Sequence, residues 1–178
     1  MRISVVVPFY NLERYVRTCL SSVLEAIRRG GADADIEVIC VDDGSTDGTS
    51  ALLDAAAADF TSAGACFRVI HQPNGGEGSA RNVGLEAATG DWVTFLDGDD
   101  VWLGGMLARA VAVLGRHPDA DIVNFVYRRK NFMYMRNRSK DRRQMNYYNS
   151  VITNKDLVKE IRLYDLSDTF ISRYEETF

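Results

Sequence analysis

Two groups of acidic residues in this sequence have the types and spacing that could bind a metal ion. VDDGSTDGT (41–49) places two adjacent carboxylates after an apolar run, and FLDGDD (95–100) places three acids within four positions. Carboxylates this close repel one another, and a hard cation with oxygen ligands relieves the repulsion. We therefore expect Asp97 and Asp99 to face a metal ion.

The expected cation is magnesium or manganese, and its preferences also indicate the ligand. Such an ion takes one or two protein carboxylates and fills its other positions with water and phosphate oxygens, so the bound molecule is expected to be a phosphate ester. For Asp42, Asp47 and Asp100 a structural alternative stays open, because aspartate also caps helices and turns.

A glycine-rich segment, HQPNGGEGSARNVG (71–84), could contact the same ligand. Its glycines allow close approach of the backbone to an anion, and the N-terminus of the helix predicted next favours negative charge. Arg81 and Asn82 lie near that helix start, although Arg81 could also be an ordinary surface residue. The segment lacks G-K-[ST] and G-x-G-x-x-G, so it is neither a P-loop nor a dinucleotide-binding fingerprint.

Alternating strands and helices must position these residues. Between residues 2 and 127, short β-rich runs alternate with amphipathic stretches, which predicts a mostly parallel sheet covered by helices. Parallel sheets bind ligands beyond the C-terminal ends of their strands, where the acidic groups fall. The predicted strands are 3–7 (ended by Pro8), 36–41, 67–71, 92–96 and 122–127, and the predicted helices are 15–27, 49–60 (capped by Ser45, Thr46 and Asp47), 78–88 and 103–114.

Composition limits the class of protein. The 178 residues are 46% hydrophobic and 26% charged, which fits one folded domain. No apolar run approaches the roughly 20 residues that span a bilayer, and no signal peptide is recognisable, so we expect a soluble, cytoplasmic chain. The net charge of −4 argues against nucleic-acid binding. Cys19, Cys40 and Cys66 are far apart in apolar contexts, so buried, reduced thiols are expected rather than a zinc site or a nucleophile.

Taken in order, four motifs resemble the family 2 glycosyltransferases of GT-A fold: VVVPFYN (5–11), VDDGSTDGT (41–49), NGGEGSARNVGLEAATGDWVTFLDGDD (74–100) and the VW that follows it (101–102). The resemblance implies an α/β fold, with a Rossmann-like, mostly parallel central sheet between layers of helices. It also implies that residues 1–127 form a nucleotide-sugar (donor) binding domain. Residues 128–178 would be a basic loop or ribbon and a partial acceptor-side segment of the same domain.

The resemblance also implies roles for individual residues. Pro8 to Asn11 and Asp43 would line the pocket for the base and ribose, although Tyr10 could also be core filling. The D-x-D sequence at 97–99 would meet the ribose and the metal ion on the diphosphate. The expected donor-binding residues are Pro8, Phe9, Tyr10, Asn11, Asp42, Asp43, Gly78, Arg81, Asn82, Asp97 and Asp99, and the expected metal ligands are Asp99 and Asp97.

The expected catalytic base lies near the end of the chain. The terminal SRYEETF resembles the family pattern Y-E-D-x-x-F with Glu176 in place of the second acid, which makes Glu176 the candidate base. The alternative is an acid pair on a frayed terminus. The family normally continues with further helices on the acceptor side, so we expect this chain to be truncated, and the apolar surface thus left uncovered could favour a homo-oligomer.

The expected reaction is inverting transfer of a sugar from a nucleoside-diphosphate sugar, expected to be a UDP-sugar, to an acceptor hydroxyl of a saccharide or lipid-linked molecule. A nucleotide-sugar-binding domain without turnover is the alternative, and a dinucleotide-dependent oxidoreductase is disfavoured because the glycine fingerprint is missing. Residues 128–143 hold eight basic residues and one acid. This segment could contact an anionic membrane surface, or it could be a solvated loop.

Overall fold

The computed structural model describes residues 1–30, 34–103, 105–117, 122–124 and 151–154. In this part of the chain, one six-stranded sheet has the order β3-β2-β1-β4-β6-β5. The strands are β1 (Arg2–Phe9), β2 (Asp35–Asp42), β3 (Cys66–His71), β4 (Trp92–Phe95), β5 (Ile122–Asn124) and β6 (Val151–Asn154). The helices are α1 (Glu13–Gly30), α2 (Thr49–Ala55), α3 (Ala57–Ser62), α4 (Glu77–Ala87) and α5 (Met106–Arg116).

The sheet is parallel over its first four strands. β1 pairs in parallel with β2 and β4, and β2 pairs in parallel with β3. β6 is antiparallel to both of its neighbours, β4 and β5. The prediction of an α/β fold with a mostly parallel sheet is therefore confirmed.

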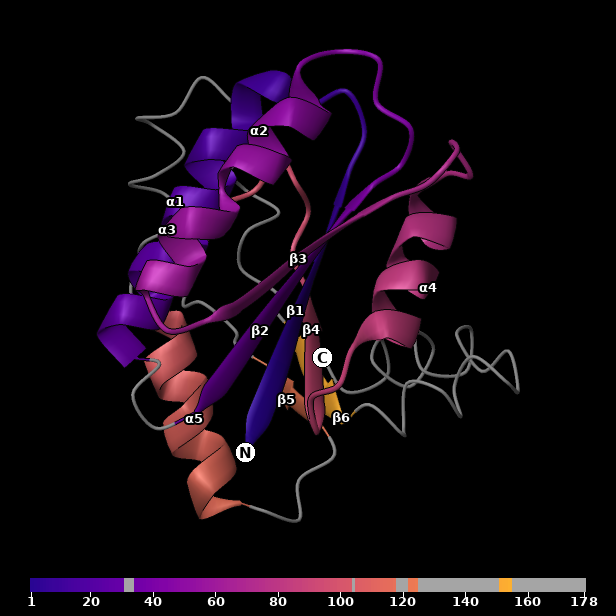
Figure 1. The fold of residues 1–178 in the computed structure, drawn as a ribbon. Coiled ribbons are helices and arrows are strands. Elements are labelled where there is room, and N and C mark those ends of the chain that lie inside the picture. The colour runs from indigo at the N-terminus through magenta and orange to yellow at the C-terminus, as the bar shows by residue number, and fades with distance from the viewer. Residues whose placement is uncertain (31–33, 104, 118–121, 125–150, 155–178) are drawn as a thin grey trace, which may run out of the picture.

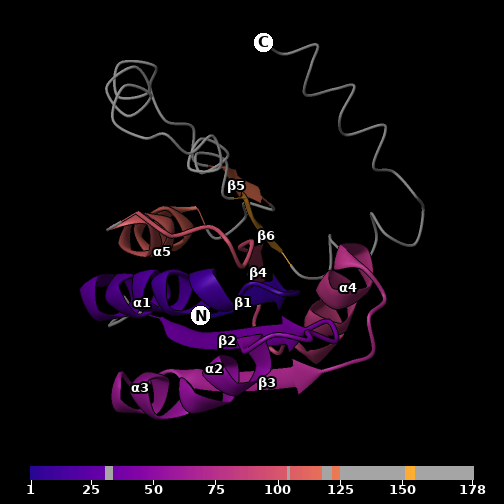
Figure 2. The ribbon, with the colours of Figure 1, turned by 90° about the horizontal axis from the view of Figure 1, so that it is seen from above.

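Helices cover both faces of the sheet. The helices α1, α2, α3 and α5 lie on one face and α4 lies on the other (Figures 1 and 2). Side chains alternate along β1 accordingly: Val5 and Val7 are buried in the larger core, whereas Val6 packs with Leu85 of α4. Burial on both faces explains why this strand is a continuous apolar run.

Local sequence signals account for the two helices that support the sheet on either side. In α1, apolar residues recur every three or four positions, and this stripe is buried. In α4, Gly84 allows close contact with the sheet, because a Cβ atom there would lie 2.3 Å from Cγ1 of Val6. α4 therefore lies directly against β1.

The predicted elements differ from the observed ones in three places. β1 continues through Pro8 to Phe9, so the prediction that Pro8 ends the strand is wrong. The carbonyl of Val6 accepts a hydrogen bond from Leu96, and the pairing of β1 with β4 ends there. The backbone of Pro8, two residues later, points toward the same side of β1 as that of Val6. Because β4 no longer pairs with β1 at that point, the absence of an N–H on Pro8 costs no hydrogen bond within the sheet.

The single helix predicted over 49–60 is two helices, α2 and α3, with Ala56 between them. The strand β6 was not predicted, and it lies between β4 and the fifth predicted strand. Cys19 and Cys40 are buried, which raises the pKa of both thiols, but Cys66 at the start of the edge strand β3 is exposed. The prediction of a buried thiol is therefore wrong for Cys66.

The basic segment 128–143 lies outside the described residues, as does the boundary proposed at residue 127. β6 comes from the predicted second region and pairs with β4 of the first. Among the helices described, none is long and apolar enough to cross a membrane.

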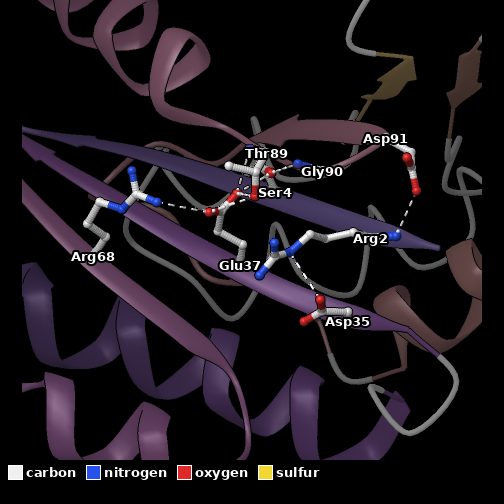
Figure 3. A network of polar contacts seen from close by, with 8 residues as sticks. All are labelled: Arg2, Ser4, Asp35, Glu37, Arg68, Thr89, Gly90 and Asp91. Carbon is white, nitrogen blue, oxygen red and sulfur yellow. Dashed lines mark hydrogen bonds and ion pairs between the residues drawn. The ribbon is translucent and has the colours of Figure 1, made fainter.

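A buried carboxylate links the strands at the N-terminal end of the parallel sheet (Figure 3). Glu37 on β2 is 1% exposed and accepts hydrogen bonds from Ser4 Oγ (2.7 Å) and Thr89 N (2.8 Å). Arg68 on β3 pairs with its other oxygen at 3.3 Å. Burial acts to raise the pKa of Glu37, but the hydrogen bonds from Thr89 and Ser4, with the charge of Arg2, lower it below its usual range. The network joins β1, β2, β3 and the turn before β4.

Candidate active site

A cavity of about 550 Å³ opens at the C-terminal ends of β1, β2 and β4. Its size is typical of small-ligand sites, and its position is where parallel sheets bind ligands. Four loops contribute to it, those that follow β1, β2, β3 and β4, together with the start of α4. Its lining residues are Pro8, Phe9, Tyr10, Leu12, Asp43, Asn74, Gly76, Glu77, Ala80, Asp97, Gly98, Asp99 and Asp100.

The cavity brings together about half of the residues expected to bind the donor. Pro8, Phe9, Tyr10, Asp43, Asp97 and Asp99 line it. Asn11, Asp42, Gly78, Arg81 and Asn82 are also described, but they do not line it. Glu176 lies outside the described residues.

The two aromatic residues after β1 have different environments. Phe9 is buried, at 1% exposure, and belongs to the core. Tyr10 is 48% exposed at the cavity, so it is not core filling. An exposed aromatic ring beside a cavity offers a flat apolar face to a ligand.

Asp43 is buried at the cavity wall and holds the glycine-rich loop in place. Its Oδ1 accepts hydrogen bonds from Gln72 Nε2 (2.6 Å) and Gly75 N (2.8 Å), and its Oδ2 accepts one from Gly76 N (2.8 Å). Its own N–H donates to the carbonyl of Phe9 (2.9 Å). Asp43 thus fixes the spacing between the loops that follow β1, β2 and β3.

The adjacent Asp42 points elsewhere. Its carboxylate accepts hydrogen bonds from Ser45 N (3.1 Å) and Ser50 Oγ, and it contacts His71 Nδ1 (2.9 Å). Burial acts to raise the pKa of Asp42, but these hydrogen bonds lower it. This geometry matches the turn-capping alternative, and it gives Asp42 no contact with the cavity.

Asn11 joins two loops rather than facing the cavity. It has a left-handed backbone, with φ of 52°, which asparagine tolerates better than most residues. Its N–H donates to Ser45 Oγ (3.0 Å), and its Oδ1 accepts from Thr46 N (2.8 Å). Asp47 links the same region, because its carboxylate accepts hydrogen bonds from Glu13 N and Thr49 N, as expected of a capping residue.

The D-x-D loop packs closely on the end of β1. A Cβ atom on Gly98 would lie 2.5 Å from Cδ1 of Phe9 and 2.7 Å from the carbonyl of Pro8, so only glycine fits there. The three neighbouring acids concentrate negative charge. Burial, together with the charges of Asp99 and Asp97, raises the pKa of Asp100 to about 6.

Arg81 reaches the D-x-D loop from α4. Its Nη2 lies 2.7 Å from Oδ1 of Asp97, and it also pairs with Glu77 one turn earlier. Arg81 is therefore not an unpaired surface residue, and it contacts the site through Asp97.

Asp97 and Asp99 could hold a metal ion whose remaining coordination positions are filled by a bound ligand. Within the described ranges, no three His, Cys, Asp or Glu side chains are grouped to hold a metal ion. Asp97 and Asp99 both line the cavity, and two carboxylates are what magnesium or manganese takes when phosphate oxygens supply the rest. The donor set therefore fits a phosphate-bound cation rather than a metal site made by protein alone.

Several site residues carried no individual signal in the sequence. Asn74, Gly76 and Ala80 fall in the segment 71–84, which was singled out as a whole, whereas Leu12 is an apolar residue of ordinary type. Gln72 lies in the same segment, but its individual role was missed because that role depends on its contact with Asp43, which lies 29 positions earlier. Only a known loop geometry reveals such a contact.

Comparison with known proteins identifies relatives of this chain. It is 40% identical over 107 residues to the uncharacterized glycosyltransferase EpsJ of Bacillus subtilis (strain 168), covering 60% of this chain and 28% of EpsJ. It is 37% identical over 122 residues to the glycosyltransferase GlyG of Streptococcus pneumoniae serotype 4, covering 68% of this chain and 37% of GlyG. The chain thus spans well under half the length of these relatives.

Solved structures give the same result. The structure of S. aureus TarS 1–349 in complex with UDP-GlcNAc matches with a TM-score of 0.61 and 31% identity, over 72% of this chain and 35% of that one. The mannosyltransferase PcManGT from Pyrobaculum calidifontis, in complex with GDP-Man and Mn²⁺, matches with a TM-score of 0.67 over 89% of this chain and 46% of that one. At 23% identity, the second match shows the shared fold only.

The model of the family described as glycosyl transferase family 2 matches residues 4–170, which is nearly the whole sequence. The match includes all the loops that line the cavity. This chain belongs to glycosyl transferase family 2.

Proposed function

We propose that this chain binds a nucleoside-diphosphate sugar, specifically a UDP-sugar, and transfers the sugar with inversion to an acceptor hydroxyl. The observation that carries the proposal is the cavity beyond β1, β2 and β4, where Tyr10, Asp43, Asp97 and Asp99 converge. An aromatic face and a buried carboxylate suit a base and ribose, while the outer acids suit a cation on a diphosphate.

The choice of UDP is supported by TarS, a structural relative at 31% identity whose complex contains UDP-GlcNAc. PcManGT binds GDP-Man with Mn²⁺, so the fold also accommodates a guanosine donor. The base is therefore part of the proposal and requires a direct test.

Asp97 and Asp99 are the residues that would hold a magnesium or manganese ion. When bound, the cation would act as a Lewis acid that stabilises charge on the departing diphosphate. The raised pKa of Asp100 agrees with this assignment: burial is its largest cause, and the negative charges of Asp99 and Asp97, which a cation would neutralise, add to it. Arg81 would hold Asp97 in its orientation through their ion pair.

The remaining step is proton removal from the acceptor, for which we propose Glu176. As the acceptor oxygen attacks the anomeric carbon and the bond to the diphosphate breaks, Glu176 would take the hydroxyl proton. This assignment rests on the terminal YEETF pattern alone. We propose a saccharide or a lipid-linked molecule as acceptor.

Turnover tests the base. UDP release from UDP-GlcNAc with water as acceptor would be followed for the 178-residue chain and for Glu176→Gln, with Glu175→Gln as the matched control. Glu176→Gln should lower turnover by about 10²–10⁴-fold while UDP affinity is retained. Equal turnover in Glu176→Gln and the wild type would remove Glu176 from the scheme.

A second candidate is nucleotide-sugar binding without turnover. The chain covers 28% of EpsJ and 37% of GlyG, so groups that those proteins use for the acceptor need not be present here. UDP binding without UDP release from any donor tested would favour this candidate.

A further inference from the structure

Gln72 contacts one of the two carboxylate oxygens of Asp43. Its side-chain nitrogen lies 2.6 Å from Oδ1 of Asp43. The group facing that carboxylate must be the amide NH₂, because an ionised carboxylate only accepts hydrogen bonds. The backbone N–H of Gln72 also donates to the carbonyl of Asp42 (3.0 Å), which anchors the residue beside β2.

The two carboxylate oxygens of Asp43 therefore differ in their hydrogen-bond partners. Oδ1 accepts from Gln72 and Gly75, and neither of these described residues lines the cavity. Oδ2 accepts from Gly76, which does line it. A carboxylate has about four acceptor positions, and the three hydrogen bonds from described residues leave one of them, on Oδ2. From the position of Gly76 we infer that Oδ2 is the oxygen nearer the cavity.

The tight packing of the loop fixes this arrangement. A Cβ atom on Gly44 would lie 2.7 Å from the N of Asn74 and 3.2 Å from the carbonyl of Gln72. Gly44 also has a left-handed backbone, with φ of 71°. The loop that carries Gln72 therefore lies directly against the residue after Asp43.

We propose that Gln72 is a positioning residue that sets the base specificity of the donor pocket, by holding Oδ1 of Asp43 away from the cavity and leaving Oδ2 as the single acceptor. This inference rests on the proposed function. Uracil offers one N–H between two carbonyl groups and matches a single acceptor. Guanine offers an N–H beside an amino group, a pair of donors that is satisfied best by both oxygens of a carboxylate.

The test compares nucleotides that differ in these donors. Calorimetric titrations with UDP, GDP and IDP in the presence of manganese would use the 178-residue chain and Gln72→Met, which keeps the side-chain length and removes the donor. Ser79→Ala is the matched control, because Ser79 Oγ also accepts a hydrogen bond from the side-chain amide of Gln72, at 3.3 Å. IDP has the same purine ring system as GDP but lacks its amino group. Comparing IDP with GDP therefore distinguishes the effect of the hydrogen-bond donors from the effect of the size of the base.

The wild type should prefer UDP to GDP, and Gln72→Met should reduce that preference by about tenfold, the effect of one hydrogen bond to a charged group. GDP should gain relative to IDP in Gln72→Met, and Ser79→Ala should leave all ratios unchanged. An unchanged UDP to GDP ratio in Gln72→Met, or a wild type that prefers GDP, would overturn the inference and leave the proposed function standing. A wild type that binds none of the three nucleotides would overturn the proposed function and the inference with it.

Discussion

The guanidinium of Arg81 on α4 and the carboxylate of Asp97 after β4 form an ion pair, with Nη2 and Oδ1 2.7 Å apart. Glu77, one turn earlier on α4, contacts the same guanidinium. The ion pair connects α4, on one face of the sheet, to the D-x-D loop that follows β4. The orientation of Asp97 therefore depends on a residue that does not itself line the cavity.

Arg81→Ala should weaken UDP binding more than it destabilises the fold. Both partners are more than a third exposed, so the pair contributes only about 0.2–1 kcal/mol to the free energy of unfolding. UDP affinity should fall by about tenfold, because Asp97 loses a hydrogen bond between charged groups. Urea unfolding and calorimetry check the two effects, with Arg109→Ala on the exposed face of α5 as control. Unchanged UDP affinity in Arg81→Ala would contradict this role.

Gly98→Ala should abolish UDP binding without altering any functional group. The new Cβ would overlap the ring of Phe9 and the carbonyl of Pro8, so the D-x-D loop must move away from β1. Misplacement of about 1 Å is enough to lower the activity of such sites about 100-fold. Gly115→Ala on α5 is the control, because a Cβ there meets nothing within 4 Å. Retained UDP affinity in Gly98→Ala would show that the loop does not form part of the site.

Glu37→Gln should destabilise the fold in a pH-dependent way while leaving the cavity intact. The substitution weakens the bonds from Arg68 and Thr89, for an expected loss of about 1–3 kcal/mol at pH 7. Because the pKa of Glu37 is lowered by folding, its ionised form stabilises the protein above the ordinary glutamate range, and this contribution disappears as pH falls through the lowered pKa.

Urea unfolding at several pH values checks this prediction. The difference between wild type and Glu37→Gln should shrink as the solution is acidified below the ordinary glutamate pKa. Glu25→Gln is the control, since Glu25 forms an exposed pair with Arg29. If the difference in the free energy of unfolding stayed constant down to the lowest pH at which the protein folds, the charge of Glu37 would not contribute to stability.

His71→Gln should affect stability with the opposite pH dependence. Hydrogen bonds with Asp42 and Asp54 raise the pKa of His71, against the smaller opposing effect of burial. The stabilisation is therefore complete below the ordinary histidine pKa and is lost as pH rises through the raised one. Only the protonated ring can donate to both carboxylates.

The melting temperatures of the wild type and His71→Gln should therefore differ more at pH 5.5 than at pH 8.5. The chain has two histidines, so His117→Gln serves as the control and also leaves a single imidazole signal for NMR titration. An NMR pKa for His71 at or below its ordinary value would contradict the bridging geometry.

Much of the fold could be predicted because its signals are local. The apolar spacing in α1 and the continuous apolar run of β1 both follow from the faces they bury. β6 could not be found in this way, because four residues carry no clear period and their place is set by pairing with β4 and β5.

The loops that form the site could be predicted from the sequence, but the individual residues that line the cavity could not. Asp42 and Asp43 are neighbours of the same type, and only the direction of each side chain separates a turn cap from a cavity wall. The contact between Gln72 and Asp43 depends on how the loop between β3 and α4 packs against the residues after β2. Non-local contacts of this kind leave no pattern in the sequence.

The most direct test of the proposed function is a calorimetric titration of the 178-residue chain with UDP at fixed salt, with and without manganese. Asp99→Asn would be measured in parallel with the control Asp59→Asn, at an exposed position of α3. The wild type and Asp59→Asn should bind UDP only when manganese is present, and Asp99→Asn should not bind it in either condition. Absence of UDP binding by the wild type in manganese, or equal affinity without the cation, would contradict a metal-assisted nucleotide-sugar site.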